Sequence, residues 1–167
     1  MKNISPRLVF AAIVAACAGL VAFAILWLQG EIGLDPCPMC ILSRYVFIVL
    51  ALVALVAAIH GPRGAMLKVY GALVFLLALT GAGISIRHSY VQHFPPAIES
   101  CGSDLDFLVS NLPLAQALPK IFQGTGSCSV VDWRFLGLSI PEWALVWYVF
   151  FAVVIVWAVF LRRTGVR

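Results

Sequence analysis

The sequence predicts an all-α membrane protein, a bundle of four transmembrane helices that forms a single domain over residues 1–167. Of its residues, 63% are hydrophobic and only 11% are charged, whereas soluble domains carry about 25% charged residues. This apolar excess is too large for one globular core and indicates an integral membrane protein. Four apolar runs each approach the roughly 20 residues that a helix needs to cross the hydrocarbon core. They cover residues 8–28, 41–59, 67–86 and 143–161.

The first run, residues 8–28, contains a motif with two interpretations. The stretch from Val14 to Cys17 follows basic residues and a short apolar segment, and so resembles a bacterial lipoprotein cleavage site. Cleavage there would cut the span in half, and the apolar run continues unbroken to Leu28, unlike a signal peptide. An ordinary span is therefore favoured, in which Cys17 is a small apolar residue buried near the middle of the bilayer.

The second run, residues 41–59, follows a short polar loop, and the pair Cys37 and Cys40 stands at the junction in Cys-x-x-Cys spacing. Pro38 suits the first helical position, so Cys40 falls in the first turn, where N–H groups and the helix dipole favour a thiolate. Arg44 shares a helix face with Cys40, and a charge inside an apolar run is a functional hypothesis by default. Redox chemistry is favoured over a structural disulfide, half of a metal site, or an Arg44 that only snorkels to the interface.

The long polar segment, residues 87–142, lies between the third run and the fourth. It contains Cys101, Cys128 and most of the acidic residues. Between these cysteines, leucines recur at helical spacing, and a second short apolar stretch covers residues 114–122. Neither piece is long enough to span, so we expect short interfacial helices, with a small packed subdomain as the alternative. The leucines are Leu105, Leu108 and Leu112.

Charge predicts the topology. Basic residues gather before the first run, in the turn between the second and third runs, and after the fourth, while the other two loops hold all seven acidic residues. The positive-inside rule then places both termini in the cytoplasm and the loops 29–40 and 87–142 on the opposite side. Since the basic residues lie at the ends of spans rather than on one face, the net charge of +4 does not indicate a nucleic-acid partner.

Four cysteines, Cys37, Cys40, Cys101 and Cys128, therefore face one compartment, which in bacteria is oxidising. Four cysteines allow three pairings, and spacing does not choose among them. A zinc site is disfavoured because zinc sites use two close-spaced pairs, so no metal is expected. Purely structural disulfides remain an alternative, although a Cys-x-x-Cys bridge closes too short a loop to add much stability.

The sequence resembles the DsbB-type disulfide bond formation proteins, which are bacterial inner-membrane quinone reductases that reoxidise DsbA. The resemblance covers nearly the whole chain. It rests on the four spans, on Cys-x-x-Cys followed by Arg44, on the loop pair Cys101 and Cys128, on Arg87-His88, and on the string from Trp133 to Trp143. One departure is Ser43, where some members carry an acid. Vitamin K epoxide reductase-like proteins are disfavoured because their loop cysteines precede the Cys-x-x-Cys.

The resemblance implies a membrane thiol:quinone oxidoreductase in the bacterial inner membrane, with both cysteine loops in the periplasm. A reduced DsbA-like partner attacks the Cys101–Cys128 disulfide, most readily at Cys101, and Cys128 exchanges with the Cys37–Cys40 pair. The implied cofactor is a quinone from the membrane pool, with ubiquinone as the first expectation and menaquinone as the alternative. Cys40, Arg44 and His88 are the residues expected to bind it, and an interfacial His88 with no role is the alternative.

The alternative from another functional class is a non-catalytic membrane subunit stabilised by structural disulfides. A small transporter has little support, because Arg44 is the only charge well inside a span and lies near its end. Loss of electron transfer on replacing Cys101 distinguishes the enzyme from the subunit.

Overall fold

Each of the four apolar runs forms a long helix in the computed structural model, which describes residues 5–34, 37–94, 128, 131 and 133–161. Helix α1 (Pro6–Ala22) continues as the π-helical η1 (Phe23–Glu31), followed by α2 (Pro38–His60) and α3 (Ala65–His93). The last helix is α7 (Ile140–Ile155), which continues as the π-helical η2 (Val156–Leu161). All four are long and apolar enough to cross a membrane. The predicted four-helix membrane bundle is therefore confirmed, and the protein is a multi-pass membrane protein.

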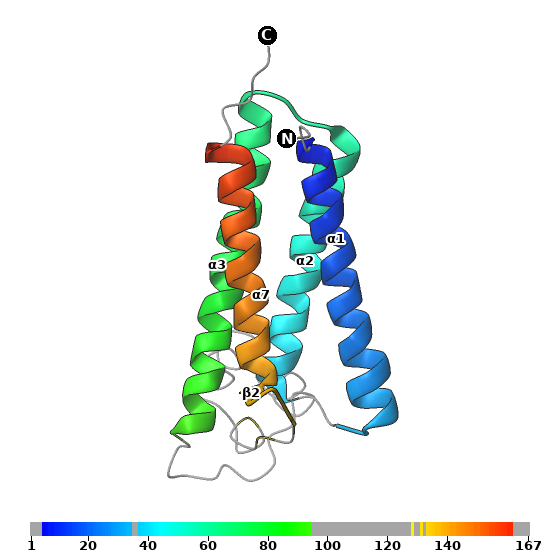
Figure 1. The fold of residues 1–167 in the computed structure, drawn as a ribbon, viewed down its shortest axis with the longest axis vertical. Helices are drawn as coiled ribbons and strands as arrows, with labels where there is room; N and C mark the ends of the chain where they lie inside the picture. The colour runs from blue at the N-terminus through cyan, green and yellow to red at the C-terminus, as the bar shows by residue number, and fades with distance from the viewer. Residues whose placement is uncertain (1–4, 35–36, 95–127, 129–130, 132, 162–167) are drawn as a thin grey trace, which may run out of the picture.

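The helices stand side by side with α1 packed on α2, α2 on α3, and α3 on α7. Figure 1 shows the beginning of α1, the connection from α2 to α3 and the end of the last helix at one end of the bundle. The beginning of α2 and the end of α3 lie at the opposite end, where the chain also forms strand β2. This opposite end holds the Cys-x-x-Cys pair.

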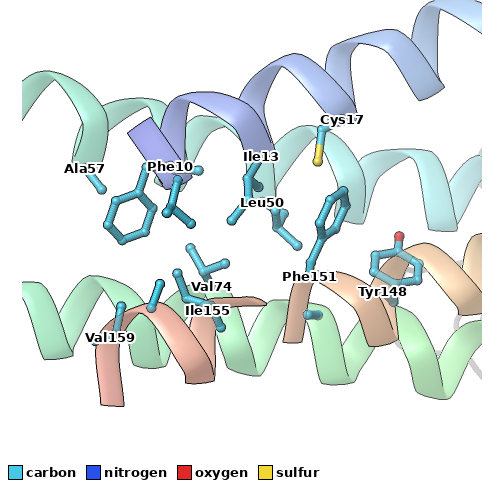
Figure 2. Close-up of a cluster of buried hydrophobic side chains, with 14 of the residues drawn as sticks. Phe10, Ile13, Cys17, Leu50, Ala57, Val74, Tyr148, Phe151, Ile155 and Val159 are labelled. Atoms are coloured by element: carbon cyan, nitrogen blue, oxygen red, sulfur yellow. The ribbon is translucent and has the colours of Figure 1, made fainter. Parts of the chain in front are cut away.

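The core lies along the bundle axis, where side chains from all four helices meet (Figure 2). Phe10, Leu50, Val74 and Ile155 are each fully buried. Large apolar side chains on the outward faces of the same helices are exposed, as expected of surfaces that face lipid. Cys17 is buried in this core at 1% exposure, as the sequence predicts for an ordinary first span.

Two glycines of α3 allow α7 and η2 to approach closely. A Cβ at Gly81 would collide with the ring of Tyr148, and a Cβ at Gly71 would lie 2.9 Å from Val159 Cγ1. Small residues at helix interfaces allow this approach in membranes. The fully buried Tyr148 ring stacks on Phe47 of α2, with ring centroids 4.2 Å apart. Tyr148 thus joins three helices.

The third helix extends beyond the predicted span. The hydropathy run ends at Ile86, but α3 continues to His93 because nothing before Phe94 breaks it. Pro95 and Pro96 follow in the sequence, and a residue that precedes proline disfavours helix. The extension carries His88 and Gln92 into the cysteine-bearing end of the bundle.

A small hairpin precedes the last helix. Strand β1 (Arg134–Phe135) pairs antiparallel with β2 (Leu138–Ser139). The two turn residues, Leu136 and Gly137, have φ values of 54° and 83°, as required in the tightest hairpin turns. The predicted short helices between Cys101 and Cys128 lie outside the described residues, as does Cys101 itself.

Candidate functional site

The Cys-x-x-Cys pair forms the first turn of α2. Cys37 is the N-cap residue and Pro38 the first helical residue, which agrees with the helix start predicted from sequence. The backbone N–H of Cys40 donates to Cys37 Sγ at 3.3 Å, and the two sulfurs lie 2.9 Å apart. Only a small approach separates these sulfurs from disulfide geometry. Cys37 is 7% exposed, whereas Cys40 is half-buried.

Cys128 completes a buried cluster with Cys37 and His88. Its sulfur, the Cys37 sulfur and a ring nitrogen of His88 all lie within 4.8 Å of one another. Cys37 Sγ is 3.6 Å from His88 Nε2, and the His88 ring also forms a hydrogen bond with the backbone of Cys128. The side chains of Cys37 and Cys128 are hydrogen-bonded as well. The structure therefore brings a cysteine of the long polar segment against the first cysteine of α2.

This cluster makes the two cysteines of α2 unequal. Hydrogen bonds with Cys128 and Cys40, together with burial, raise the pKa of the Cys37 thiol. A raised pKa means that Cys37 keeps its proton, and its S–H group donates to Cys40 Sγ at 2.9 Å, while Arg44 lies one turn further along the same helix. The geometry thus favours Cys40 as the thiolate and Cys37 as the thiol of a reduced pair.

Arg44 lies one turn beyond Cys40 and is held by a residue of η1. Its Nη1 donates to Gln29 Oε1 at 2.7 Å, and this contact is partly buried. The acceptor is a neutral amide, so this hydrogen bond orients the guanidinium without itself neutralising the positive charge. Such a charge is available to a thiolate or to an anionic group that develops beside it.

A cavity of about 610 Å³ opens beside these residues. Its wall is mostly apolar, and the polar groups that reach it include Cys37, Cys40, Arg44 and His88. Pockets of this kind, apolar with few placed polar groups, are typical binding sites for small ligands and cofactors. The aromatic residues that line the cavity are Phe23, Trp27, Phe47, Trp133, Phe135, Trp143 and Trp147.

The hairpin that precedes α7 closes one side of this cavity. Trp133 and Phe135 stack at 5.8 Å between ring centroids, and Trp143 Nε1 donates to the Phe135 carbonyl at 3.0 Å. At Ser139, the backbone N–H donates to Glu142 Oε2 at 2.6 Å, which fixes the start of the helix. The string from Trp133 to Trp143 therefore builds a rigid aromatic wall.

The cysteine–histidine cluster and the adjoining cavity suit two different kinds of bound group. The three ligating atoms of Cys37, His88 and Cys128 are close enough for a metal ion, and two sulfurs with one imidazole would suit zinc. The adjoining cavity fits a different group, a flat, mostly apolar molecule that accepts hydrogen bonds, because the guanidinium of Arg44 supplies donors at an apolar wall that His88 also lines. A quinone has this shape and chemistry.

Five of the six predicted site residues meet at one end of the bundle: Cys37, Cys40, Arg44, His88 and Cys128. The sixth, Cys101, lies outside the described residues. Sequence reasoning missed Gln29 and Glu142. A lone polar side chain at the end of the first apolar run was the available signal for Gln29, and the Ser-x-x-Glu pattern was the signal for Glu142.

Comparisons with known proteins identify the family to which the chain belongs. The family described as "Disulfide bond formation protein DsbB" matches residues 6–158. A disulfide bond formation protein B of Aromatoleum aromaticum is 48% identical over 161 residues, covering 96% of each chain. A protein of the same name from an Azoarcus species is 46% identical, covering 94% of each. The chain therefore belongs to the DsbB family, membrane oxidoreductases that generate disulfides by reoxidising DsbA at the expense of a quinone.

Proposed function

We propose that electrons pass from a periplasmic DsbA-like dithiol through Cys101 and Cys128, then through Cys37 and Cys40, to a quinone in the 610 Å³ cavity. One observation carries this proposal. The buried sulfurs of Cys37 and Cys128 meet beside a cavity that also contains Cys40 and Arg44. A stabilising disulfide would need neither the cavity nor an arginine that a neutral amide holds on its wall, so the alternative of a non-catalytic subunit is not favoured.

The relay consists of successive thiol–disulfide exchanges. A thiolate of the partner attacks Cys101, forms a mixed disulfide with it, and releases Cys128 as a thiolate. Cys128 attacks Cys37 of the Cys37–Cys40 disulfide, which forms a Cys37–Cys128 bridge and releases Cys40 as a thiolate. The second partner thiolate then frees Cys101, which attacks Cys128 and restores the first disulfide. The partner leaves oxidised, and its two electrons remain on Cys37 and Cys40.

The proton balance of this relay is fixed by the two cysteines. The partner gives up two thiol protons, of which Cys37 takes one because its pKa is raised. The other proton leaves, since Cys40 remains a thiolate. A bound quinone supplies the two-electron acceptor that returns this pair to a disulfide.

Arg44 and His88 hold the acceptor end of the site. Arg44, fixed by Gln29, stabilises negative charge on Cys40 and on a quinone oxygen. His88, 4% exposed and 3.6 Å from Cys37 Sγ, donates a hydrogen bond and a proton at the quinone oxygen. Ubiquinone is the proposed acceptor, with menaquinone as the alternative.

The proposed orientation places the cysteine-bearing end of the bundle in the periplasm. The opposite end carries Arg7, Arg63 and Lys68. Arg7 also donates to the carbonyls of Ala58 and Ile59, at 3.2 and 2.9 Å, which ties this basic end together. The positive-inside rule supports a cytoplasmic location for that end. The proposed location is the bacterial inner membrane, with both termini cytoplasmic.

The test is quinone reduction by the purified protein in detergent, with a reduced thioredoxin-like protein as donor. Wild type is compared with Cys40→Ser, Cys101→Ser and the matched control Cys17→Ala, which removes a buried core cysteine away from the site. We expect turnover to be lost in the first two variants and kept in the control. Normal turnover in Cys101→Ser or Cys40→Ser would contradict the relay. Comparison of ubiquinone with menaquinone as acceptor tests which quinone is used.

A further inference from the structure

A stripe of polar side chains runs along α3 beside the proposed quinone cavity. Ser85, His88, Ser89 and Gln92 occupy positions i, i+3, i+4 and i+7, which lie on one helix face. Ser85 Oγ, Ser89 Oγ and Gln92 Oε1 are buried, and none has a hydrogen-bond partner in the part of the chain that the structure describes. Buried polar atoms are almost always hydrogen-bonded, to water where protein groups are lacking. The stripe therefore has the composition of a hydrated path.

The stripe ends at a second cavity, of about 60 Å³. A cavity needs about 10–15 Å³ to hold a water molecule, so this one has room for several. His93, Arg134 and Glu142 line it, and Gln92 lines both this cavity and the larger one. His93 Nε2 lies 4.0 Å from Glu142 Oε1, and their side chains are 60% and 25% exposed. Proton-exchanging groups in contact with solvent thus adjoin the stripe.

The reaction itself requires a proton from outside the cysteine pair. A quinone becomes a quinol by taking two electrons and two protons. When Cys37 is a thiol and Cys40 a thiolate, formation of their disulfide supplies both electrons but only one proton. Arg44 does not deprotonate in proteins, and Ser43 is engaged with Tyr148, its Oγ 3.3 Å from the phenol oxygen. The second proton has to reach the cavity by another route.

We propose that the second cavity, Gln92 and Ser89 form a water-filled proton inlet that reloads His88 from the surface pair His93–Glu142, with Ser85 one turn beyond His88 at its inner end. The inlet rests on the proposed function, because it serves a quinone reduced beside His88. Neighbouring residues one turn apart on a helix have Cβ atoms about 5–6 Å from each other, so one water spans each step from Gln92 to His88.

Charged and titratable groups surround both ends of the inlet. At the outer end they are His93 of α3, Arg134 of β1 and Glu142 of α7. At the inner end His88 faces Cys37 and Cys128, with Cys40 and Arg44 on the wall of the same cavity. Each end of the inlet therefore has groups that exchange protons. At the outer end they are the solvated side chains of His93 and Glu142, and at the inner end they are the thiols and imidazole of the Cys37, Cys128 and His88 cluster.

The decisive variant is Gln92→Leu, which keeps the side-chain volume and removes the polar link between the cavities. The full-length enzyme in detergent is reduced with dithiothreitol and mixed with a short-chain ubiquinone, and quinol formation is followed by absorbance. General acid–base steps are worth at least about a hundredfold, and a partly bypassed inlet should therefore slow quinol formation about tenfold. The solvent isotope effect in heavy water should rise, and added imidazole should restore the rate.

Two further variants keep the proposal testable if Gln92→Leu does not fold. Glu142→Gln removes the titrating carboxylate and keeps a side chain that can cap the helix. We expect it to slow quinol formation and to respond to imidazole in the same way. The matched control is Thr80→Val, a polar-to-apolar change on the same helix at an exposed position, where the hydroxyl only donates to the Leu76 carbonyl.

The outcomes separate the inlet from the proposed function. Wild-type rates in both Gln92→Leu and Glu142→Gln would overturn the inlet, as would a deficit that neither imidazole nor heavy water alters. If Arg44→Met and His88→Phe also reduce quinone at the wild-type rate, the proposed quinone site itself is wrong. If those two are slow and the inlet variants are normal, only the inlet is wrong.

Discussion

Gln29 gives the sharpest test of how Arg44 works, because it contacts the guanidinium without being charged itself. Its Oε1 accepts from Arg44 Nη1 at 2.7 Å in a partly buried setting. The change Gln29→Leu removes this acceptor and preserves most of the side-chain volume. Arg44 then loses the contact that holds it on the wall of the cavity, and we expect quinone reduction to slow while the helices stay in place.

The size of the effect follows from the kind of hydrogen bond. Hydrogen bonds to charged groups contribute about 1.5–3 kcal/mol. Because this one is only partly buried, the lower figure applies, and about 1.5 kcal/mol corresponds to about a tenfold loss in kcat/KM for quinone. Reduction of the enzyme by its dithiol donor takes place at other cysteines and should change less than this.

A double-mutant cycle with Arg44→Met separates positioning from general damage. If Gln29 acts through Arg44, Gln29→Leu costs about tenfold in the wild type and almost nothing when Arg44 is already replaced. The assay is kcat and KM for a short-chain ubiquinone at saturating donor, with the thermal unfolding midpoint of each variant measured beside it. Penalties that multiply in the double variant would refute the reasoning, since Gln29 would then act independently of Arg44.

The remaining predictions concern packing and thiol reactivity. Gly81→Ala should lower the free energy of unfolding by about 1–3 kcal/mol because its Cβ meets the Tyr148 ring, whereas Gly83→Ala, with open space around it, should be close to neutral in the same unfolding assay. Tyr148→Phe should cost about 1 kcal/mol, the value of its 2.9 Å hydrogen bond to an α2 carbonyl, and a wild-type unfolding free energy would contradict that bond. In the reduced enzyme at neutral pH, iodoacetamide should modify Cys40 before Cys37. The reason is that the raised pKa keeps Cys37 protonated until the pH exceeds the ordinary thiol value of 9.0. Mass spectrometry of the first adduct decides the order, and an initial adduct on Cys37 would show that its proton is not retained.

The bundle could be predicted because each span follows from a local property, a run of apolar residues of sufficient length. The ends of helices were harder to predict, since hydropathy and helix formation stop at different residues. Arg87 and His88 end the apolar run. The helix nevertheless continues, because its backbone hydrogen bonds do not depend on apolar side chains, and it ends only where proline follows. As a result, α3 reaches His93 and presents His88 and Gln92 to the site.

The sequence was enough to identify most residues of the site, but not the contacts between residues of different helices. Cys37, Cys40 and Arg44 are near in sequence, so helix periodicity alone places them together. The meeting of Cys37 with Cys128 and His88 depends on how α3 packs beside α2 and on the path of the long polar segment, which no local pattern fixes. Gln29 was missed for the same reason, because its partner lies on another helix.

The packing of Tyr148 explains why the beginning of α2 can serve as a fixed platform for exchange. Its ring fills the space that Gly81 leaves on α3 and stacks on Phe47 of α2, while its hydroxyl donates to the Ser43 carbonyl. These contacts lock the turn that carries Cys40 and Arg44 against two other helices. Where some family members carry an acid, Ser43 therefore adds a neutral hydroxyl to this lock and no negative charge beside Arg44. Neither Gln29, which accepts from Arg44, nor the preceding residue Ser43 thus offsets the positive charge that the thiolate and the quinone require.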